Sequence, residues 1–276
     1  MVKDIIVNLS VGGAAASATD YAVSVAAAFQ AHLAGVAFCY EPAAVEIDYG
    51  LVPAHLIEEE RAKALHSAKS AAKAFEECAR RNGVSVEIRL IEGTFATACD
   101  QFAVIARRFD LSVITQPEPS KLVPEQLIIE AALFDSGRPI LVVPYIQKSG
   151  LALNRVMLCW DGSRNAARAT ADAMPLLLRA DSVEVVIVAA ERPKSDEMPG
   201  AEIAHHLARH ALKVSVKRIV SVETDVPNTL LSHAADSEAD LIVMGGYGHS
   251  RLREFILGGA TRGILAAMTV PVLMSH

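Results

Sequence analysis

Short apolar runs alternate with longer Ala-rich stretches along the whole chain. In its second half, continuous Val/Ile/Leu-rich runs predict five strands, near residues 154–160, 183–190, 213–220, 240–245 and 270–275. The intervening stretches predict helices near residues 164–180, 197–212, 225–237 and 259–268. Because the strands are apolar at successive positions, we expect helices to bury both of their faces. The alternation predicts right-handed crossovers and a doubly wound, Rossmann-like parallel sheet of the α/β class.

The same order of elements occurs twice in the chain. The run that begins at Ile5 matches the run at Val156 with an offset of 151 residues, and 109–114 matches 239–244 with an offset of 130. The difference of 21 residues predicts an insertion in the first half, and the long helical pattern at 53–81 accommodates it. This helix is expected to be amphipathic, with a solvated outer face.

We therefore predict two tandem five-stranded domains, residues 1–146 and 153–276. The polar segment 147–150 would be the linker between them.

Composition supports two packed domains and limits the partners. The chain has 276 residues, 52% of them hydrophobic and 21% charged, which argues against disorder. Its net charge of −6 gives no electrostatic reason to expect nucleic acid or an anionic membrane as a partner. No apolar run reaches about 18 residues, so no membrane span is expected. No signal peptide is recognisable, and a cytoplasmic location is expected.

The four cysteines form no CxxC pair, so no zinc or redox motif is predicted. Cys39 and Cys159 lie in apolar runs and are expected to fill core space.

The segment after the strand at 240–245 is rich in glycine and leads into the last predicted helix. Gly245 and Gly248 would permit positive φ and close approach of a ligand, and Gly258 and Gly259 would do the same before the helix. The main-chain N–H groups that open this helix would point at a phosphate, aided by the helix dipole. They belong to Gly259, Ala260 and Thr261, and the Thr261 hydroxyl could add a further bond.

The G-x2-G-x9-G spacing of this segment resembles the nucleotide loop of the ATP-binding branch of the universal stress protein family, within the adenine nucleotide α hydrolase-like folds. The strand that ends in Met244-Gly245, the Gly248-His249-Ser250 stretch and the final strand at 269–273 match as well. The resemblance covers most of 153–276 and extends weakly to 1–146. It implies ATP as the ligand, with Mg²⁺ as a candidate companion ion. Gly259 stands where the family usually has Ser or Thr, so one hydroxyl contact to the phosphates is missing.

The resemblance also assigns roles around the loop. Asp161 would contact the ribose or help to hold a phosphate-bound cation, although a turn or helix-capping role is the alternative. Val188, Ala189 and Met244 would line the adenine slot. His249 could either touch phosphate or point to solvent.

The first half departs from this pattern. Ser10 stands at the position of Asp161, and Thr115 and Glu118 stand at those of Gly245 and Gly248. Pro117 removes a donor, and Glu118 would place negative charge where phosphate lies. Residues 1–146 are therefore expected to bind no ATP in the family's manner.

No catalytic motif is recognisable, because GxSxG, HExxH and Walker patterns are all missing. The sequence favours an ATP-binding stress-response protein with a binding or sensing role and at most slow hydrolysis. A non-nucleotide interaction protein of the same fold is the alternative. His206 and His210 share a helix face and could hold a metal, but an exposed face without a metal is the simpler interpretation.

The resemblance further implies how the two halves assemble. They would pair through 140–143 and 272–274 as an intramolecular pseudo-dimer, with a further homodimer as an option.

Overall fold

The structure is a computed structural model that describes residues 1–9, 13–40, 54–117, 125–189, 200–220, 226–246 and 259–276. The first half contains β1 (Asp4–Leu9), α1 (Gly13–Phe29), β2 (His32–Tyr40), α2 (Ala54–Arg81), β3 (Val86–Gly93), α3 (Phe95–Ala106), β4 (Leu111–Thr115), α4 (Glu125–Asp135) and β5 (Ile140–Val143). The second half contains β6 (Arg155–Cys159), α5 (Arg164–Leu177), β7 (Ser182–Ala189), α6 (Ala201–Arg209), β8 (Val214–Val220), α7 (Val226–Asp236), β9 (Leu241–Gly245), α8 (Gly259–Ala267) and β10 (Val272–Ser275).

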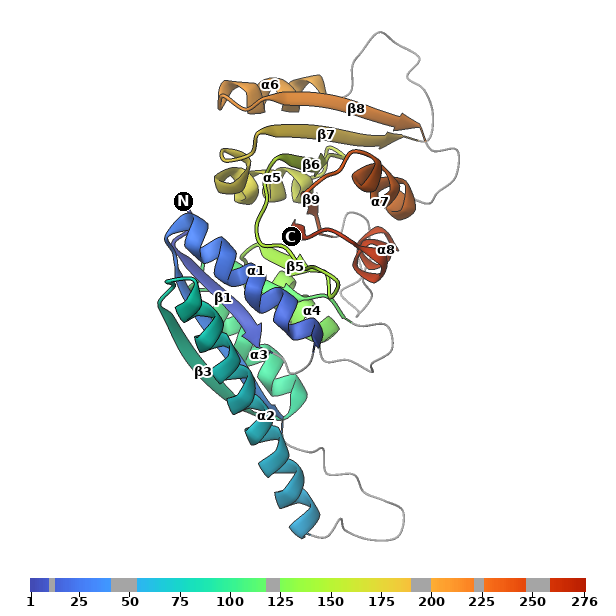
Figure 1. Cartoon of the computed structure of the whole chain (residues 1–276). Helices are drawn as coiled ribbons and strands as arrows, with labels where there is room; N and C mark the ends of the chain where they lie inside the picture. Colours follow the sequence, from blue (N-terminus) through green and yellow to red (C-terminus); the bar gives the residue numbers. More distant parts are fainter. Residues whose placement is uncertain (10–12, 41–53, 118–124, 190–199, 221–225, 247–258) are drawn as a thin grey trace.

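These ten strands form one continuous sheet, in the order β3-β2-β1-β4-β5-β10-β9-β6-β7-β8 (Figure 1). Neighbouring strands are parallel except at the centre, where β5 and β10 run antiparallel with Leu141 opposite Leu273. The predicted pairing of the two halves through their last strands is therefore confirmed. The doubly wound α/β fold is confirmed as well, since each half contributes five neighbouring strands with helical crossovers.

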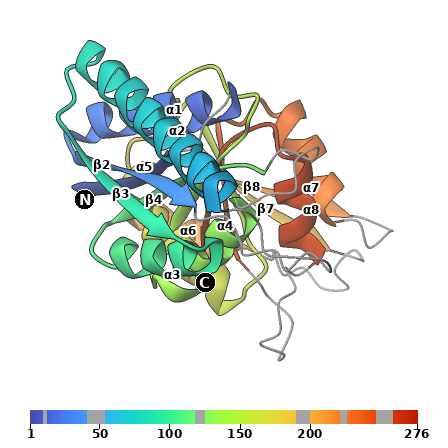
Figure 2. The same ribbon diagram turned by 90° about the horizontal axis from the view of Figure 1, so that it is seen from below.

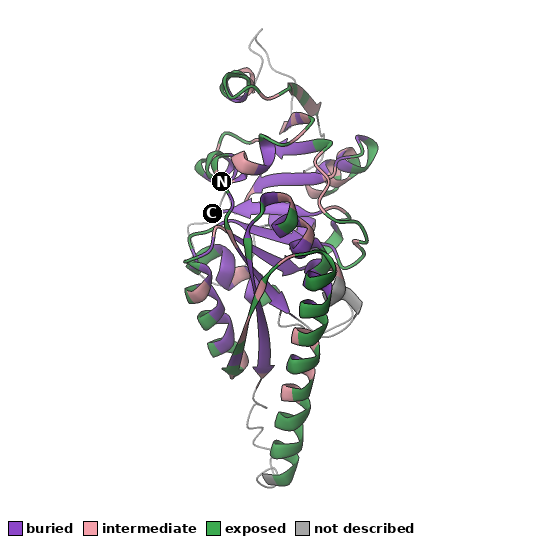
Figure 3. Cartoon of the chain, turned by 60° about the vertical axis from the view of Figure 1, so that its left-hand side comes forward, coloured by how far each residue is buried: buried purple, intermediate pink, exposed green. Residues whose placement is uncertain are grey.

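Two hydrophobic cores lie on opposite faces of the sheet. Buried residues of α1, α2, α5 and α6 form one core, and those of α3, α4, α7 and α8 form the other. Figure 3 shows the inner strands between them as almost entirely buried, whereas the edge strands β3 and β8 are mostly half-buried or exposed. On the second face α7 and α8 lie side by side (Figure 2), where Gly263 of α8 leaves room for the ring of Pro227. The inner strands thus have the double burial that their sequence predicts. The expectation is wrong for β8, which lies at the edge of the sheet and has no fully buried residue.

The insertion is the long helix α2, as predicted, and only part of it covers the sheet. Phe75 is fully buried where the helix crosses β2, and an added Cβ at Gly35 would lie 2.5 Å from its ring. Earlier in the helix the side chains of residues 55–63 are exposed, and Figure 3 shows these turns extending away from the body. All four cysteines are buried and free, which confirms the core role expected for Cys39 and Cys159.

Candidate functional site

The strand order places a topological switch point in the second half. Its strands lie in the order β8-β7-β6-β9-β10, so the direction of winding reverses between β6 and β9. In open α/β sheets ligands bind outside the carboxyl ends of the strands at such a switch point. Asp161 follows β6, Gly245 ends β9, and Val188 and Ala189 end β7. The fold therefore brings these predicted site residues to one edge of the sheet.

Asp161 forms the turn between β6 and α5. Its Oδ1 accepts a hydrogen bond from the N–H of Ser163 at 2.9 Å, and Gly162 between them has a φ of 76°. Ser163 then caps α5, because its Oγ accepts from the N–H of Ala166 at 3.1 Å. The turn role that the sequence left open is thus present. Asp161 is also exposed, so its carboxylate remains accessible at the sheet edge.

One of the two reasons expected for Gly245 is wrong. We predicted that this glycine permits positive φ and close approach of a ligand, but Gly245 does not adopt a positive φ. An added Cβ would instead lie 2.6 Å from the nitrogen of Ala166 and 2.7 Å from the carbonyl carbon of Asn165. Gly245 is needed because the first turn of α5 packs directly on the end of β9. Because Gly245 has no side chain, the start of α5 can lie beside the end of β9, which leads into the glycine-rich segment.

Two residues that sequence reasoning missed fix the start of the loop. Asn165 is 6% exposed, and its Nδ2 donates to the carbonyl oxygen of Gly246 at 2.6 Å. His276 Nδ1 lies 3.2 Å from the same oxygen and 3.2 Å from Asn165 Nδ2. The N–H of Gly246 donates to Ser275 at 2.7 Å. The only signal in the sequence was an Asn in the first turn of a predicted helix. This signal could not identify a hydrogen-bond partner 81 residues away.

The helix α8 begins at Gly259, as predicted. Gly259 and Ala260 are exposed, whereas Thr261 is buried at 2% exposure. The first N–H groups of a helix have no acceptor within it, so this end favours an anion. An added Cβ at Gly259 would have no atom within 4 Å, so the position has room for a larger residue. Gly248, His249 and Gly258 lie outside the described residues.

The residues predicted to line an adenine slot differ in exposure. Val188 and Ala189 are half-buried at the end of β7, whereas Met244 is 6% exposed and belongs to the core on the α7–α8 face. Val188 packs against the same core. Accessible apolar surface at this edge therefore comes from β7 more than from β9.

The corresponding edge of the first half is built differently. The N–H of Thr115 at the end of β4 donates to Oδ1 of Asn8 in β1 at 3.2 Å, so a side chain bridges the two strands. The strand registers of the two halves correspond, so that Cys159 is equivalent to Asn8 and Gly245 is equivalent to Thr115. Asn8 and Thr115 are buried, and Ser10 and Glu118 lie outside the described residues.

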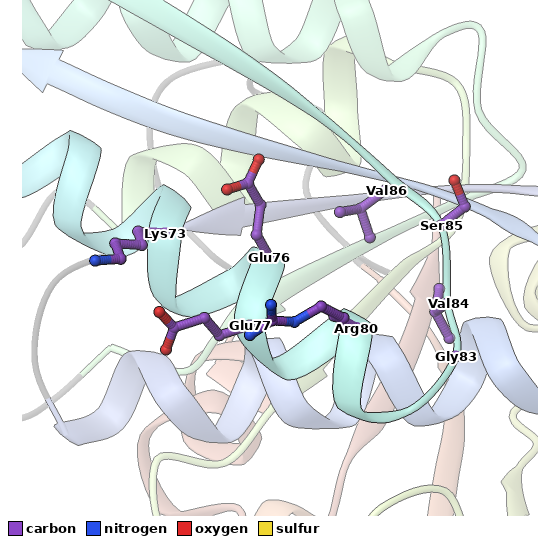
Figure 4. Close-up of a pocket in the computed structure, with 8 residues that line it drawn as sticks. All are labelled: Lys73, Glu76, Glu77, Arg80, Gly83, Val84, Ser85 and Val86. Atoms are coloured by element: carbon purple, nitrogen blue, oxygen red, sulfur yellow. The ribbon is translucent and has the colours of Figure 1, made fainter.

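Other candidate sites fall elsewhere. A surface groove lies between the last turns of α2 and the start of β3 (Figure 4). It is at the amino end of the strands, opposite the edge where doubly wound folds bind ligands. The rings of His206 and His210 lie 5.0 Å apart, and both residues are exposed. In the part of the chain that the structure describes, no group of three or more His, Cys, Asp or Glu is arranged to hold a metal. Among the described helices none has the length and apolarity to cross a membrane.

Fold and strand order together define a doubly wound, Rossmann-like α/β protein with a candidate ligand edge at the switch point of its second half. Residues 152–276 match the model of the Universal stress protein family. Over these residues the chain is similar to the universal stress protein family.

Individual relatives are similar to the chain as well. A universal stress protein of Synechocystis sp. is 26% identical over 139 residues, which are 49% of this chain and 46% of that protein. The chain thus spans about half the length of this curated relative. The crystal structure of an Archaeoglobus fulgidus universal stress protein has a TM-score of 0.67 at 16% identity, covering 98% of this chain and 97% of that one. A functionally unknown protein of Pseudomonas aeruginosa has a TM-score of 0.60 at 13% identity, covering 99% and 92%. At these identities the two structures show the fold alone.

Proposed function

We propose that this protein binds ATP in its second half and acts by binding or sensing the nucleotide, with at most slow hydrolysis. The observation that carries the proposal is the convergence of two helix N-termini on one switch point. The helix α5 follows β6 directly, α8 follows the segment after β9, and β6 and β9 are neighbours. Both helices therefore begin at the carboxyl edge of the sheet, where their dipoles favour a phosphate.

The residues at this edge suit a nucleotide. The exposed main chain of Gly259 and Ala260 offers N–H donors without a side chain in the way at position 259. Asp161 is an exposed carboxylate that would hold a phosphate-bound Mg²⁺ or contact the ribose, and a bound cation would neutralise phosphate charge. Val188 and Ala189 supply half-buried apolar surface for a base. The loop spacing, which resembles that of the ATP-binding branch of the family, points the same way.

The first half contributes no equivalent site on this proposal. The side chain of Asn8 instead bridges β1 and β4 at this edge by accepting from the N–H of Thr115. We accordingly propose one nucleotide per chain, in a domain of residues 153–276, with residues 1–146 as a second domain that holds no ATP.

Native mass spectrometry of freshly purified protein, followed by calorimetric titration with ATP and Mg²⁺, tests the proposal. We expect one adenine nucleotide per chain. Gly248→Glu should abolish binding, because a carboxylate would enter the phosphate site. If the unmodified protein binds no nucleotide, the alternative of an interaction protein with the same fold takes its place.

A further inference from the structure

Gln116, in the first half of the chain, is held rigidly beside the centre of the sheet. It follows β4 and is 1% exposed. Its N–H donates to the carbonyl of Val143 at 2.8 Å, and its Oε1 accepts from the N–H of Tyr145 at 3.3 Å. These two bonds fix both the main chain and the orientation of the side-chain amide.

The remaining end of this amide reaches the second half. Gln116 Nε2 donates to the carbonyl oxygen of Leu265 at 2.9 Å, across 149 residues of sequence. Leu265 lies in the last turn of α8, where helix carbonyls lack donors within the helix. Gln116 therefore acts as a C-terminal cap for α8, provided by the other half of the chain.

The internal repeat gives this contact a counterpart. Gln116 corresponds to Gly246 at an offset of 130 residues, and Leu133 corresponds to Leu265 at the offset of 132 that also relates Pro139 to Pro271. An added Cβ at Gly246 would lie 2.9 Å from Cδ2 of Leu133. In each half, the residue that follows the fourth strand thus contacts the equivalent leucine of the other half. Gln116 contacts Leu265, and Gly246 contacts Leu133. Only Gln116 carries a side chain that can bond to its partner helix.

The elements on both sides of the glycine-rich segment therefore contact the first half. Gly246 before the segment packs on Leu133 of α4, and α8 after it is capped by Gln116. His276, which lies against the carbonyl of Gly246, also meets the ring of Phe134 edge-on with centroids 5.0 Å apart.

We infer that Gln116 is a positioning residue for the nucleotide site: it holds α8 so that the N–H groups of Gly259 and Ala260 face the phosphates. The inference rests on the proposed function. It gives the first half a role that requires no ligand of its own. The half that does not bind ATP serves as the fixed support against which the phosphate-binding helix of the other half is aligned.

The test compares Gln116→Leu with Gln126→Ala in the full-length protein. Gln126 is a matched control, because its Nε2 also donates to a side-chain acceptor, Glu130 at 3.0 Å, but on the exposed surface of α4. Hydrogen–deuterium exchange of the α8 amides is measured without nucleotide, and ATP affinity by calorimetry. Loss of one buried hydrogen bond should speed α8 exchange and weaken ATP binding, each on the order of tenfold, in Gln116→Leu only.

Gln116→Glu separates positioning from general stability. When ionised, its carboxylate would face the Leu265 carbonyl without a donor, whereas when protonated it would again present one O–H and one acceptor. We expect the ATP affinity of this variant, relative to the unmodified protein at the same pH, to recover as the pH is lowered. A purely structural defect would instead change the urea midpoint of the variant in parallel with its affinity at each pH.

The outcomes are distinct. Unchanged α8 exchange, or unchanged ATP affinity despite faster exchange, in Gln116→Leu would overturn the inference. The failure of the unmodified protein to bind ATP would overturn the proposed function instead, and it is seen without any substitution.

Discussion

The α-carbon of Gly245 packs directly against the main chain of Asn165. A side-chain carbon at position 245 would lie 2.7 Å from the carbonyl carbon of Asn165 and 2.6 Å from the nitrogen of Ala166. Both atoms belong to the main chain at the start of α5 and cannot move aside as a flexible side chain would. The end of β9 and the start of α5 therefore keep their spacing only with glycine.

Gly245→Ala is therefore expected to destabilise the protein. Forcing a methyl group against the main chain should lower the free energy of unfolding by about 1–3 kcal/mol, as overpacking usually does. Urea denaturation followed by circular dichroism measures this. The control is Gly259→Ala, because Gly259 has no positive φ and no atom near its Cβ position, whereas Gly83 has a φ of 69° and would be strained by a side chain. Gly259→Ala should be neutral or slightly stabilising. An equal loss of stability in Gly245→Ala and Gly259→Ala would refute the packing argument.

Gly259→Ser should strengthen nucleotide binding. The position lies in open space at the start of α8, so the hydroxyl can be added without a clash. A new hydrogen bond to a phosphate oxygen is worth about 1–2 kcal/mol, or roughly a tenfold lower Kd for ATP. Calorimetry on Gly259→Ser and Gly259→Ala separates the effect of the hydroxyl from that of the added Cβ. Identical affinities in the two variants would show that no phosphate comes near this residue.

Because its thiols are buried, the protein is expected to lose stability at alkaline pH. Burial raises the pKa of Cys159 to about 12, with a smaller contribution from Asp161. Burial also raises the pKa of Cys78 to about 11, helped by the hydrogen bond to Asp20, and that of Cys99 to about 11. Thiols of the unfolded chain ionise near pH 9, so between pH 9 and 12 the unfolded state binds fewer protons than the folded one. This contribution to stability is complete below pH 9 and is lost as the pH rises through the folded values.

Urea midpoints between pH 8 and 11 measure this dependence. Because Lys and Tyr side chains titrate in the same range, the comparison is with Cys159→Ala, whose stability should fall less steeply with pH. Parallel curves for the two proteins would show that Cys159 ionises equally easily in both states. In the native protein at pH 7.5 the same burial should keep all four thiols unreactive toward iodoacetamide until urea is added.

The periodicity of the predicted strands and helices was sufficient for the fold, because burial on both faces gives the inner strands continuous apolar runs. The runs at 240–245 and 259–268 predicted β9 and α8 to within one residue at each end. The duplicated order of elements also located the α2 insertion. Such features are local or repeat regularly, so the sequence displays them directly.

Contacts between distant segments left no such mark. Gly245 was recognised as special, but for φ rather than for the approach of Asn165, because a glycine alone does not tell which neighbour excludes its Cβ. Gln116 and His276 were missed altogether, since their partners lie across the centre of the sheet or in another strand. Polar side chains buried at an interface between repeats can be identified only when the geometry of that interface is known.

Asp161 forms a turn and is proposed to contact the nucleotide, and substitutions can separate the two roles. Asp161→Asn keeps an oxygen that can accept from the N–H of Ser163, so the turn and the stability should change by less than about 0.5 kcal/mol. The charge is lost, so affinity for ATP in the presence of Mg²⁺ should fall by about tenfold or more, as expected for a charge-assisted contact. Asp161→Ala removes both functions and should lose stability as well as affinity. Calorimetric titration of each variant gives its affinity for ATP, and urea denaturation gives its stability.

Ser10→Ala, at the equivalent position of the first half, serves as the control and should leave ATP affinity unchanged. Wild-type affinity in Asp161→Asn would restrict this residue to its turn, and weakened binding in Ser10→Ala would move the site to the other half.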